Sequence, residues 1–246
     1  WVITFPRRLR YFLHRDPVLL GRVRRCVLRA IESGLRRRCP EAPPDSRFGA
    51  VSFVQRFGSA LNAHTHLHSC VTDGMFSVDA AGALRFHPTA DVTEALVSAV
   101  QRRIRSRVLR LAVRHGALTP DVAADLARWG HDGGFSLHAA VRVEAEDRAG
   151  LERLLRYCAR PAFASERLCW DGPDQPVRYT LPKPLPTGRT ELTLAPLELL
   201  DRLAALIPPP RRHRHHYAGV FAPHAALRAH VTTCAGQPVT ATAPVT

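Results

Sequence analysis

Three histidines alternate within a short stretch, LNAHTHLHSC, at residues 61–70. Residues two apart on a β-strand share one face, so His64, His66 and His68 are expected to project together. Neutral imidazole is the commonest protein nitrogen ligand for divalent metal ions, and histidine also transfers protons in catalysis. The spacing therefore predicts a metal site or a catalytic histidine cluster rather than ordinary polar residues on an exposed strand.

Three known kinds of site contain such a strand. The run resembles that of histidine-triad nucleotide hydrolases, in which the middle histidine attacks a phosphate, although Thr65 is polar here and the chain is long for that family. It also resembles the opening strand of amidohydrolase-type metal enzymes, which need a barrel of about 250 residues that this chain's irregular order of elements does not suggest. The third kind, the HUH single-strand nucleases, would use His66 and His68 together with a tyrosine nucleophile on a later helix.

Tyr157 is the candidate nucleophile among the four tyrosines, because it falls within a predicted helix at 147–160. The apolar residues of that helix form one stripe at helical spacing, made of Leu151, Leu154, Leu155 and Cys158. Tyr157 lies off this stripe, between Arg153 and Arg160. A phenol flanked by guanidinium groups is well suited to meet a phosphodiester.

Hydrophobic periodicity predicts a mixture of strands and helices in irregular order. Strands are expected at 1–5, 48–58, 63–72, 82–86, 134–145, 177–182 and 190–194. Helices are expected at 17–38, 92–114, 119–129, 147–160 and 195–207. This order predicts an α+β fold with a central antiparallel sheet flanked by helices. We expect a nuclease core at 1–170, a C-terminal part at 171–230 and a disordered tail at 231–246.

Charge and composition limit the class of partner. Lys and Arg number 35 against 21 acidic residues, a formal charge of +14, and all the cations but Lys183 are arginine. Such an excess suits a polyanion, most simply nucleic acid, whose phosphates arginine binds in a bidentate manner. Six cysteines without a CxxC pair argue against a zinc ribbon or a disulfide scaffold, and no apolar run is long enough to span a membrane. We expect a protein of the reducing cytoplasm, associated with the nucleoid.

Three blocks of sequence, in this order, resemble one family. The blocks are FGSALNAHTHLHSCVTDGMF, LERLLRYCARPAFASERL and VRYTLPKPLPTGRTELTLAPLELLDRLAALIPPPRRHRHHYAGVFAP. They resemble the rolling-circle insertion-sequence transposases of the HUH superfamily, often called two-tyrosine transposases. The resemblance extends from Trp1 to about residue 230.

The resemblance implies a function and a set of site residues. Tyr157 would attack DNA and form a 5′-phosphotyrosine, and a Mg²⁺ or Mn²⁺ ion would be held by His66 and His68, with Gln55 or His138 as third ligand. The partner would be single-stranded DNA at the ends of the protein's own mobile element. The residues expected to contact that strand are His64, Arg153, Arg156 and Arg160.

Two features depart from the family pattern. Two-tyrosine members carry a second tyrosine four residues after the first, where this chain has Pro161, so it resembles the single-tyrosine branch typical of common-region elements. The family's cysteine-rich segment before the position of Trp1 is also absent, which predicts an N-terminally truncated chain.

Two alternatives stay open: a non-catalytic DNA-binding remnant, or a histidine-triad nucleotide hydrolase. The basic run RRHRHHY, with His213, His215 and His216, is expected to be a DNA-facing loop.

Overall fold

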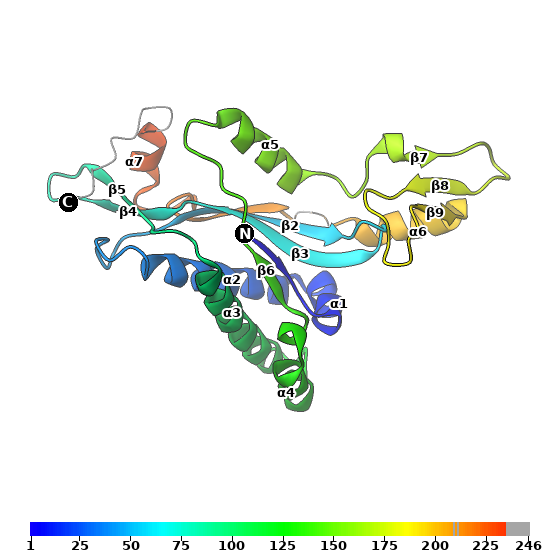
Figure 1. Ribbon diagram of the computed structural model, residues 1–246, viewed down its shortest axis with the longest axis horizontal. Coiled ribbons are helices and arrows are strands. Elements are labelled where there is room, and N and C mark those ends of the chain that lie inside the picture. Colours follow the sequence, from blue (N-terminus) through cyan, green and yellow to red (C-terminus); the bar gives the residue numbers. More distant parts are fainter. Residues whose placement is uncertain (209, 211, 235–246) are drawn as a thin grey trace.

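A five-stranded antiparallel sheet forms the centre of the computed structural model, which describes residues 1–208, 210 and 212–234 (Figure 1). The strand order is β10–β2–β3–β1–β6, and helices cover both faces, so the predicted α+β fold is confirmed. The strands of this sheet are β1 (Val2–Thr4), β2 (Gly49–Phe57), β3 (Ala63–Val71), β6 (Ser136–His138) and β10 (His215–Gly219).

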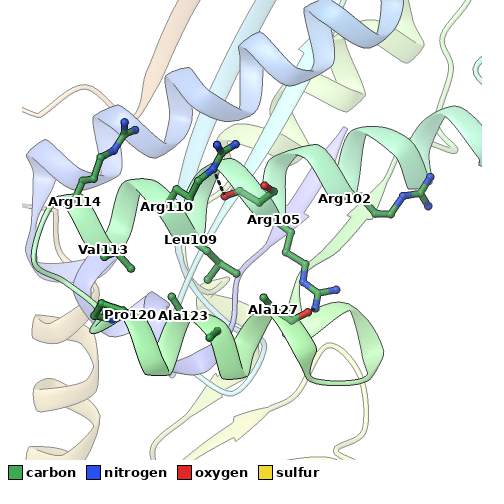
Figure 2. Close-up of a pocket in the computed structure, with 11 residues that line it drawn as sticks. Arg102, Arg105, Leu109, Arg110, Val113, Arg114, Pro120, Ala123 and Ala127 are labelled. Atoms are coloured by element: carbon green, nitrogen blue, oxygen red, sulfur yellow. Dashed lines mark hydrogen bonds between the residues drawn. The ribbon is translucent and has the colours of Figure 1, made fainter.

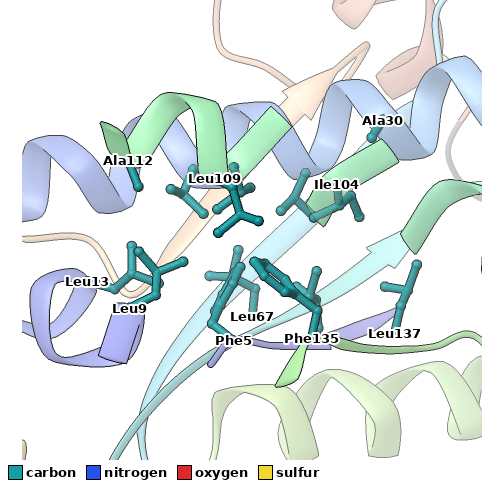
Figure 3. Packing of buried hydrophobic residues seen from close by; sticks show 14 of the residues in the cluster. Phe5, Leu9, Leu13, Ala30, Leu67, Ile104, Leu109, Ala112, Phe135 and Leu137 are labelled. Atoms are coloured by element: carbon teal, nitrogen blue, oxygen red, sulfur yellow. The ribbon is translucent and has the colours of Figure 1, made fainter. Parts of the chain in front are cut away.

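The strand alternation gives the sheet one apolar and one histidine-bearing face. Ile3, Leu67 and Leu137 are neighbours across β1, β3 and β6, and all three are buried in the main core. Figure 3 shows Leu67 and Leu137 within that core. That core lies between the sheet and four helices: α1 (Arg7–Arg15), α2 (Pro17–Arg36), α3 (Glu94–Arg114) and α4 (Pro120–Arg128). The three histidines of β3 occupy the opposite face, which is crossed by α5 (Arg148–Ala159) (Figure 1).

The two long helices below the sheet are fixed by caps and by one close contact. Asp16 caps α2 by accepting hydrogen bonds from the amides of Val18 and Leu19, and Thr93 caps α3. Gly34 allows α2 to approach α3, because a Cβ at this position would lie 2.6 Å from a methyl group of Val100. Larger residues at 34 would therefore force the two helices apart.

Smaller elements surround the central sheet. A hairpin is formed by β4 (Gly74–Val78) and β5 (Leu84–Pro88), and a three-stranded sheet by β7 (Leu168–Cys169), β8 (Val177–Thr180) and β9 (Glu191–Leu194). The remaining helices are α6 (Pro196–Leu206), α7 (Arg228–Thr233) and the 3₁₀ turns at His131–Gly134 and Ser165–Arg167. A second apolar cluster joins β8, β9 and α6 to Leu61, which lies in the turn between β2 and β3 with φ of 54°.

Several sequence-based expectations were wrong in detail. The strand expected at 134–145 is limited to β6, since residues 139–145 form no strand, and helices α1 and α7 were not predicted. His215 and His216 belong to strand β10 rather than to a loop, because they pair with Phe53 and Ser52 of β2. The expected strand at 82–86 corresponds to β5, which pairs with β4. Of the predicted tail, 231–233 is helical, and 235–246 lies outside the described residues.

No helix among the described residues is both long and apolar enough to cross a membrane.

Candidate active site

The three imidazoles of β3 lie in a row on one face of the sheet, as the alternation predicted. Ring centroids are 5.2 Å apart for His64 and His66, and 5.0 Å apart for His66 and His68. His68 is buried, whereas His64 and His66 are half-buried. The pairing register shifts here: Gln55 of β2 pairs with His66, but Phe57 pairs with Ala63, so His64 lies opposite an irregular step in the ladder.

The tautomer of His66 is fixed by the backbone. Its Nδ1 donates a hydrogen bond of 2.7 Å to the carbonyl oxygen of His64, so the neutral ring carries its lone pair on Nε2. Metal-binding histidines are commonly oriented by such a bond from the nitrogen that does not bind the metal. His66 is therefore held in a form that can bind a cation through Nε2.

Burial keeps the three imidazoles neutral. Burial, with contributions from Arg10 and His66, lowers the pKa of His64 to about 4. Burial and the neighbouring His66 lower the pKa of His68 to about 4, and the pKa of His66 is lowered mainly by burial. At pH 7 all three rings thus offer lone pairs rather than positive charge.

Gln55 connects the histidine strand to helix α5. Its Nε2 donates to the carbonyl oxygen of Cys158 at 2.9 Å and, more weakly, to that of Tyr157 at 3.4 Å. Its Oε1 is buried and accepts no hydrogen bond from the described residues. A buried acceptor without a partner costs about 1–3 kcal/mol, so this oxygen is available for a cation beside His66.

Tyr157 lies on α5 directly over this row. Its ring centroid is 5.7 Å from that of His68, in an edge-to-face arrangement with an interplanar angle of 73°. The side chain is 50% exposed, so the phenol is accessible from solvent although its ring packs against His68. Asp147 caps α5 through the amide of Gly150 at 2.7 Å, and Cys158 is buried against the sheet, which together fix the rotation of the helix.

Arg160, at the C-terminal end of α5, stacks between two aromatic rings. Its guanidinium carbon is 4.8 Å from the ring centroid of Tyr157 and 5.7 Å from that of Phe57. Its charge also contributes to the lowered pKa of His66 and His68. Arg160 is thus a fixed cation at the point where the tyrosine, the histidines and Phe57 meet.

A cleft opens beside this arrangement. It has a volume of about 390 Å³ and is bounded by β2, by the segment after α5 and by the end of α6. Its lining includes Gln55, Phe57, Arg160, Phe163 and His215. The cleft therefore combines aromatic surfaces, a cation and the unsatisfied amide oxygen.

Other predicted site residues lie apart from this centre. Arg153 and Arg156 are exposed and face carboxylates, with Arg153 3.9 Å from Asp147 and Arg156 2.7 Å from Glu152. His138 is exposed and separated from His68 by strand β1, because both residues pair with Val2. Between the two candidate third ligands, the geometry favours Gln55.

Within the described residues, no group of three His, Cys, Asp or Glu side chains is arranged to hold a metal ion. A site at this position therefore depends on an amide oxygen in addition to imidazoles.

Three neighbours of the site were not predicted from the sequence to lie there. Phe57 could have been found, since it lies two residues after Gln55 on the same strand and so shares its face. Arg10 of α1 and His215 of β10 approach through tertiary packing, which no local pattern reveals.

A second cavity, of about 690 Å³, lies between α3 and α4 on the other side of the sheet (Figure 2). Leu109, Val113 and Ala123 contribute apolar surface, and Arg105 reaches across to the backbone carbonyls of Leu126 and Ala127. This cavity contains none of the histidines or tyrosines described above.

Comparison with known proteins identifies a family to which the chain is similar. A family model described as “Putative transposase” matches residues 49–228, which include β2, the histidine strand and all of α5. No curated protein and no solved structure matches the chain. The match covers well over half of the chain and disfavours the nucleotide-hydrolase alternative. The chain belongs to this transposase family.

Proposed function

We propose that this transposase nicks and joins single-stranded DNA through a covalent 5′-phosphotyrosine on Tyr157, in rolling-circle-type transposition. The observation that carries the proposal is the approach of the half-exposed Tyr157 to His68, the neutral imidazole at one end of the row of three. Tyrosine and histidine meet here from elements almost 90 residues apart in sequence. Neither a packing role nor simple DNA binding requires that meeting.

The proposed reaction is a transesterification. The phenol oxygen of Tyr157 loses its proton and forms a bond to phosphorus, while the bond from phosphorus to the 3′ oxygen of the upstream nucleotide breaks. That 3′ oxygen takes up a proton and becomes a free hydroxyl, and the downstream strand stays attached to the tyrosine through its 5′ phosphate. Joining is the reverse attack by a 3′ hydroxyl, so no external energy source is needed.

The donor set fits a divalent ion. His66 and His68 offer neutral imidazoles and Gln55 offers an unsatisfied oxygen, a mixed nitrogen and oxygen set that we assign to Mg²⁺ or Mn²⁺. When bound, such an ion acts as a Lewis acid on the scissile phosphate. The anchoring of Gln55 to the backbone of α5 ties this ligand to the position of the nucleophile.

The surrounding residues would hold the strand. Arg160 supplies a cation already ordered by its two aromatic neighbours, which lowers the entropy lost when it binds a phosphate. Phe57 and Phe163 offer faces on which bases stack, a contact worth about 1–3 kcal/mol per base. Together these three residues would form a path for the single strand along the cleft beside β2.

The proposal is tested by incubating the protein with Mn²⁺ and single-stranded oligonucleotides that carry the ends of the element, labelled 3′ of the cleavage site. A band containing both label and protein on a denaturing gel is expected. It should vanish in Tyr157→Phe and persist in Tyr217→Phe, a matched change at another half-exposed tyrosine. DNA binding without any covalent band would instead identify a non-catalytic DNA-binding protein.

A further inference from the structure

A ridge of unpaired arginines runs along α2 and α3, on the side of the sheet opposite the histidines. We define this arginine ridge by six exposed or half-buried residues on the two helices or, for Arg37, directly after α2: Arg29, Arg37, Arg103, Arg107, Arg110 and Arg114. In the described part of the chain, none of the six forms an ion pair. The ridge is therefore a concentrated positive charge that the protein itself does not neutralise.

The members of the ridge are close enough to repel one another. Arg37 and Arg103 both donate to the hydroxyl of Ser33, at 3.1 and 2.6 Å, and the charge of Arg37 is the main cause of the lowered pKa of Arg103. Such crowding costs folding free energy, so an external anion that bound here would relieve it.

The charge continues to the other end of the helix pair. The other four ridge arginines, those not bound to Ser33, all lie near Cys26 of α2. Burial raises the pKa of the Cys26 thiol, and the positive charges of these four arginines oppose that rise. Figure 2 shows Arg110 and Arg114 projecting from α3 away from α4, so they do not serve the α3–α4 cavity alone. The ridge is thus continuous from Arg103 to Arg114, a length of about 17 Å at 1.5 Å per residue.

The chemistry of the ridge distinguishes between possible polyanions. Neither α2 nor α3 contains an aromatic residue, so the bases of a single strand would find no stacking partner on it. Duplex DNA needs only contacts to phosphate, and about 17 Å corresponds to roughly five base pairs of its backbone. The aromatic-lined cleft beside Tyr157 and the ridge therefore suit different forms of DNA.

We propose that the arginine ridge is a second DNA-binding site, which holds the phosphate backbone of duplex DNA while the histidine face holds the single strand. The inference rests on the proposed function in one respect: both sites would engage DNA of the same element. It assigns to α2 and α3 a role in binding that the nicking chemistry does not require.

The test compares two triple variants with the same change in charge. The ridge variant is Arg103→Gln, Arg107→Gln and Arg110→Gln. The control is Arg85→Gln, Arg128→Gln and Arg178→Gln, three arginines that each pair with a carboxylate. Affinity for a labelled 30-base-pair duplex is measured by fluorescence polarisation across a range of salt concentrations.

The ridge variant is expected to lose roughly 100-fold in duplex affinity at 0.1 M salt, with a salt slope shallower by about 2.7, which is about 0.9 for each phosphate contact removed. The control should stay within about threefold of the wild type, and the thermal unfolding midpoint of the ridge variant should be unchanged or raised. Equal loss in both triples would overturn the proposal, because charge alone would then explain binding. So would ridge-dependent binding to vesicles of anionic phospholipid with no binding to duplex.

Failure of this inference is separable from failure of the proposed function. The ridge variant should still form the covalent band on short single-stranded oligonucleotides. A wild type that binds duplex through the ridge but never forms that band would contradict the tyrosine chemistry alone.

Discussion

The phenol ring of Tyr157 stands edge-on to the imidazole of His68, with their centroids 5.7 Å apart. Tyr157 comes from α5 and His68 from β3, and the side chain of Gln55 binds the end of that helix to the sheet beside them. The position of Tyr157, the proposed nucleophile, is therefore set by one buried amide as well as by helix packing.

This dual role of Gln55 predicts distinct effects for two substitutions. Gln55→Leu removes the hydrogen bond to α5, which destabilises the fold, and also the unsatisfied oxygen, which stabilises it by a similar amount, so the unfolding free energy should change by less than about 1 kcal/mol. The Mn²⁺ concentration that half-saturates nicking should rise roughly tenfold. Gln55→Glu keeps an oxygen beside His66 and should nick at a lower Mn²⁺ concentration than Gln55→Leu. Identical metal dependence in the two variants would show that residue 55 does not bind the ion.

Arg160 should contribute more to single-strand binding than its helical neighbour Arg156. Arg160 stacks on Tyr157 and Phe57, whereas Arg156 forms an ion pair with Glu152. Arg160→Gln is expected to weaken single-strand affinity roughly tenfold and to reduce the salt slope by about 0.7, the value for one contact to a single strand. Arg156→Gln, measured in the same titration, should change affinity by less than about twofold. A reversed order would contradict the assignment of Arg160.

The neutral histidines predict a loss of stability in mild acid. Unfolded histidine has an ordinary pKa near 6.5, whereas His64 and His68 have pKa values of about 4 in the fold. Between these values the unfolded chain binds protons that the folded chain does not, so the unfolding free energy should decrease as pH falls from 7 to 4. Denaturant unfolding of the metal-free protein at pH 7, 6 and 5 measures this slope. The unfolding free energy of the double variant His64→Gln, His68→Gln should depend less steeply on pH than that of the wild type. An equal slope in the two proteins would contradict the argument that burial lowers these pKa values.

Substitution of Leu61, which takes no part in the proposed reaction, should strongly lower the stability of the fold. It is 1% exposed, and its cluster joins the β2–β3 turn to β8, β9 and α6. Leu61→Ala is expected to lower the unfolding free energy by about 2–5 kcal/mol, against about 0.5 kcal/mol for Leu197→Ala at an exposed position. Leu61→Gly relieves the positive φ, which costs a non-glycine residue about 1–2 kcal/mol, and should therefore be no worse than Leu61→Ala. A much larger loss for glycine would contradict the strain at this residue.

Local patterns were sufficient for the elements whose periodicity is strong. The period of two in β3 gave the common face of the histidines, and the apolar stripe of α5 gave the outward position of Tyr157, which the fold places over that face. Gln55 was named as a possible ligand from its strand alone, but its hydrogen bonds to α5 depend on packing between distant segments.

Other features had no local signal. Strand β10 is formed by HHYAG, whose composition suggests a loop, and it becomes a strand because β2 offers an open edge. Helix α1 is only nine residues long, so the spacing of Leu9 and Leu13 was too short a pattern to detect. The difference between Arg153 and Arg160 was also hidden, because it comes from their partners and not from their helical positions.

The most direct test of the central claim is to locate the covalent adduct on the protein. After reaction with single-stranded DNA and Mn²⁺, nuclease trimming and tryptic digestion should yield the peptide 157–167, which contains a single tyrosine. Mass spectrometry is predicted to find a nucleotide attached through its 5′ phosphate to Tyr157. An adduct on Tyr217 or on a histidine, or cleaved DNA without any adduct, would contradict the account.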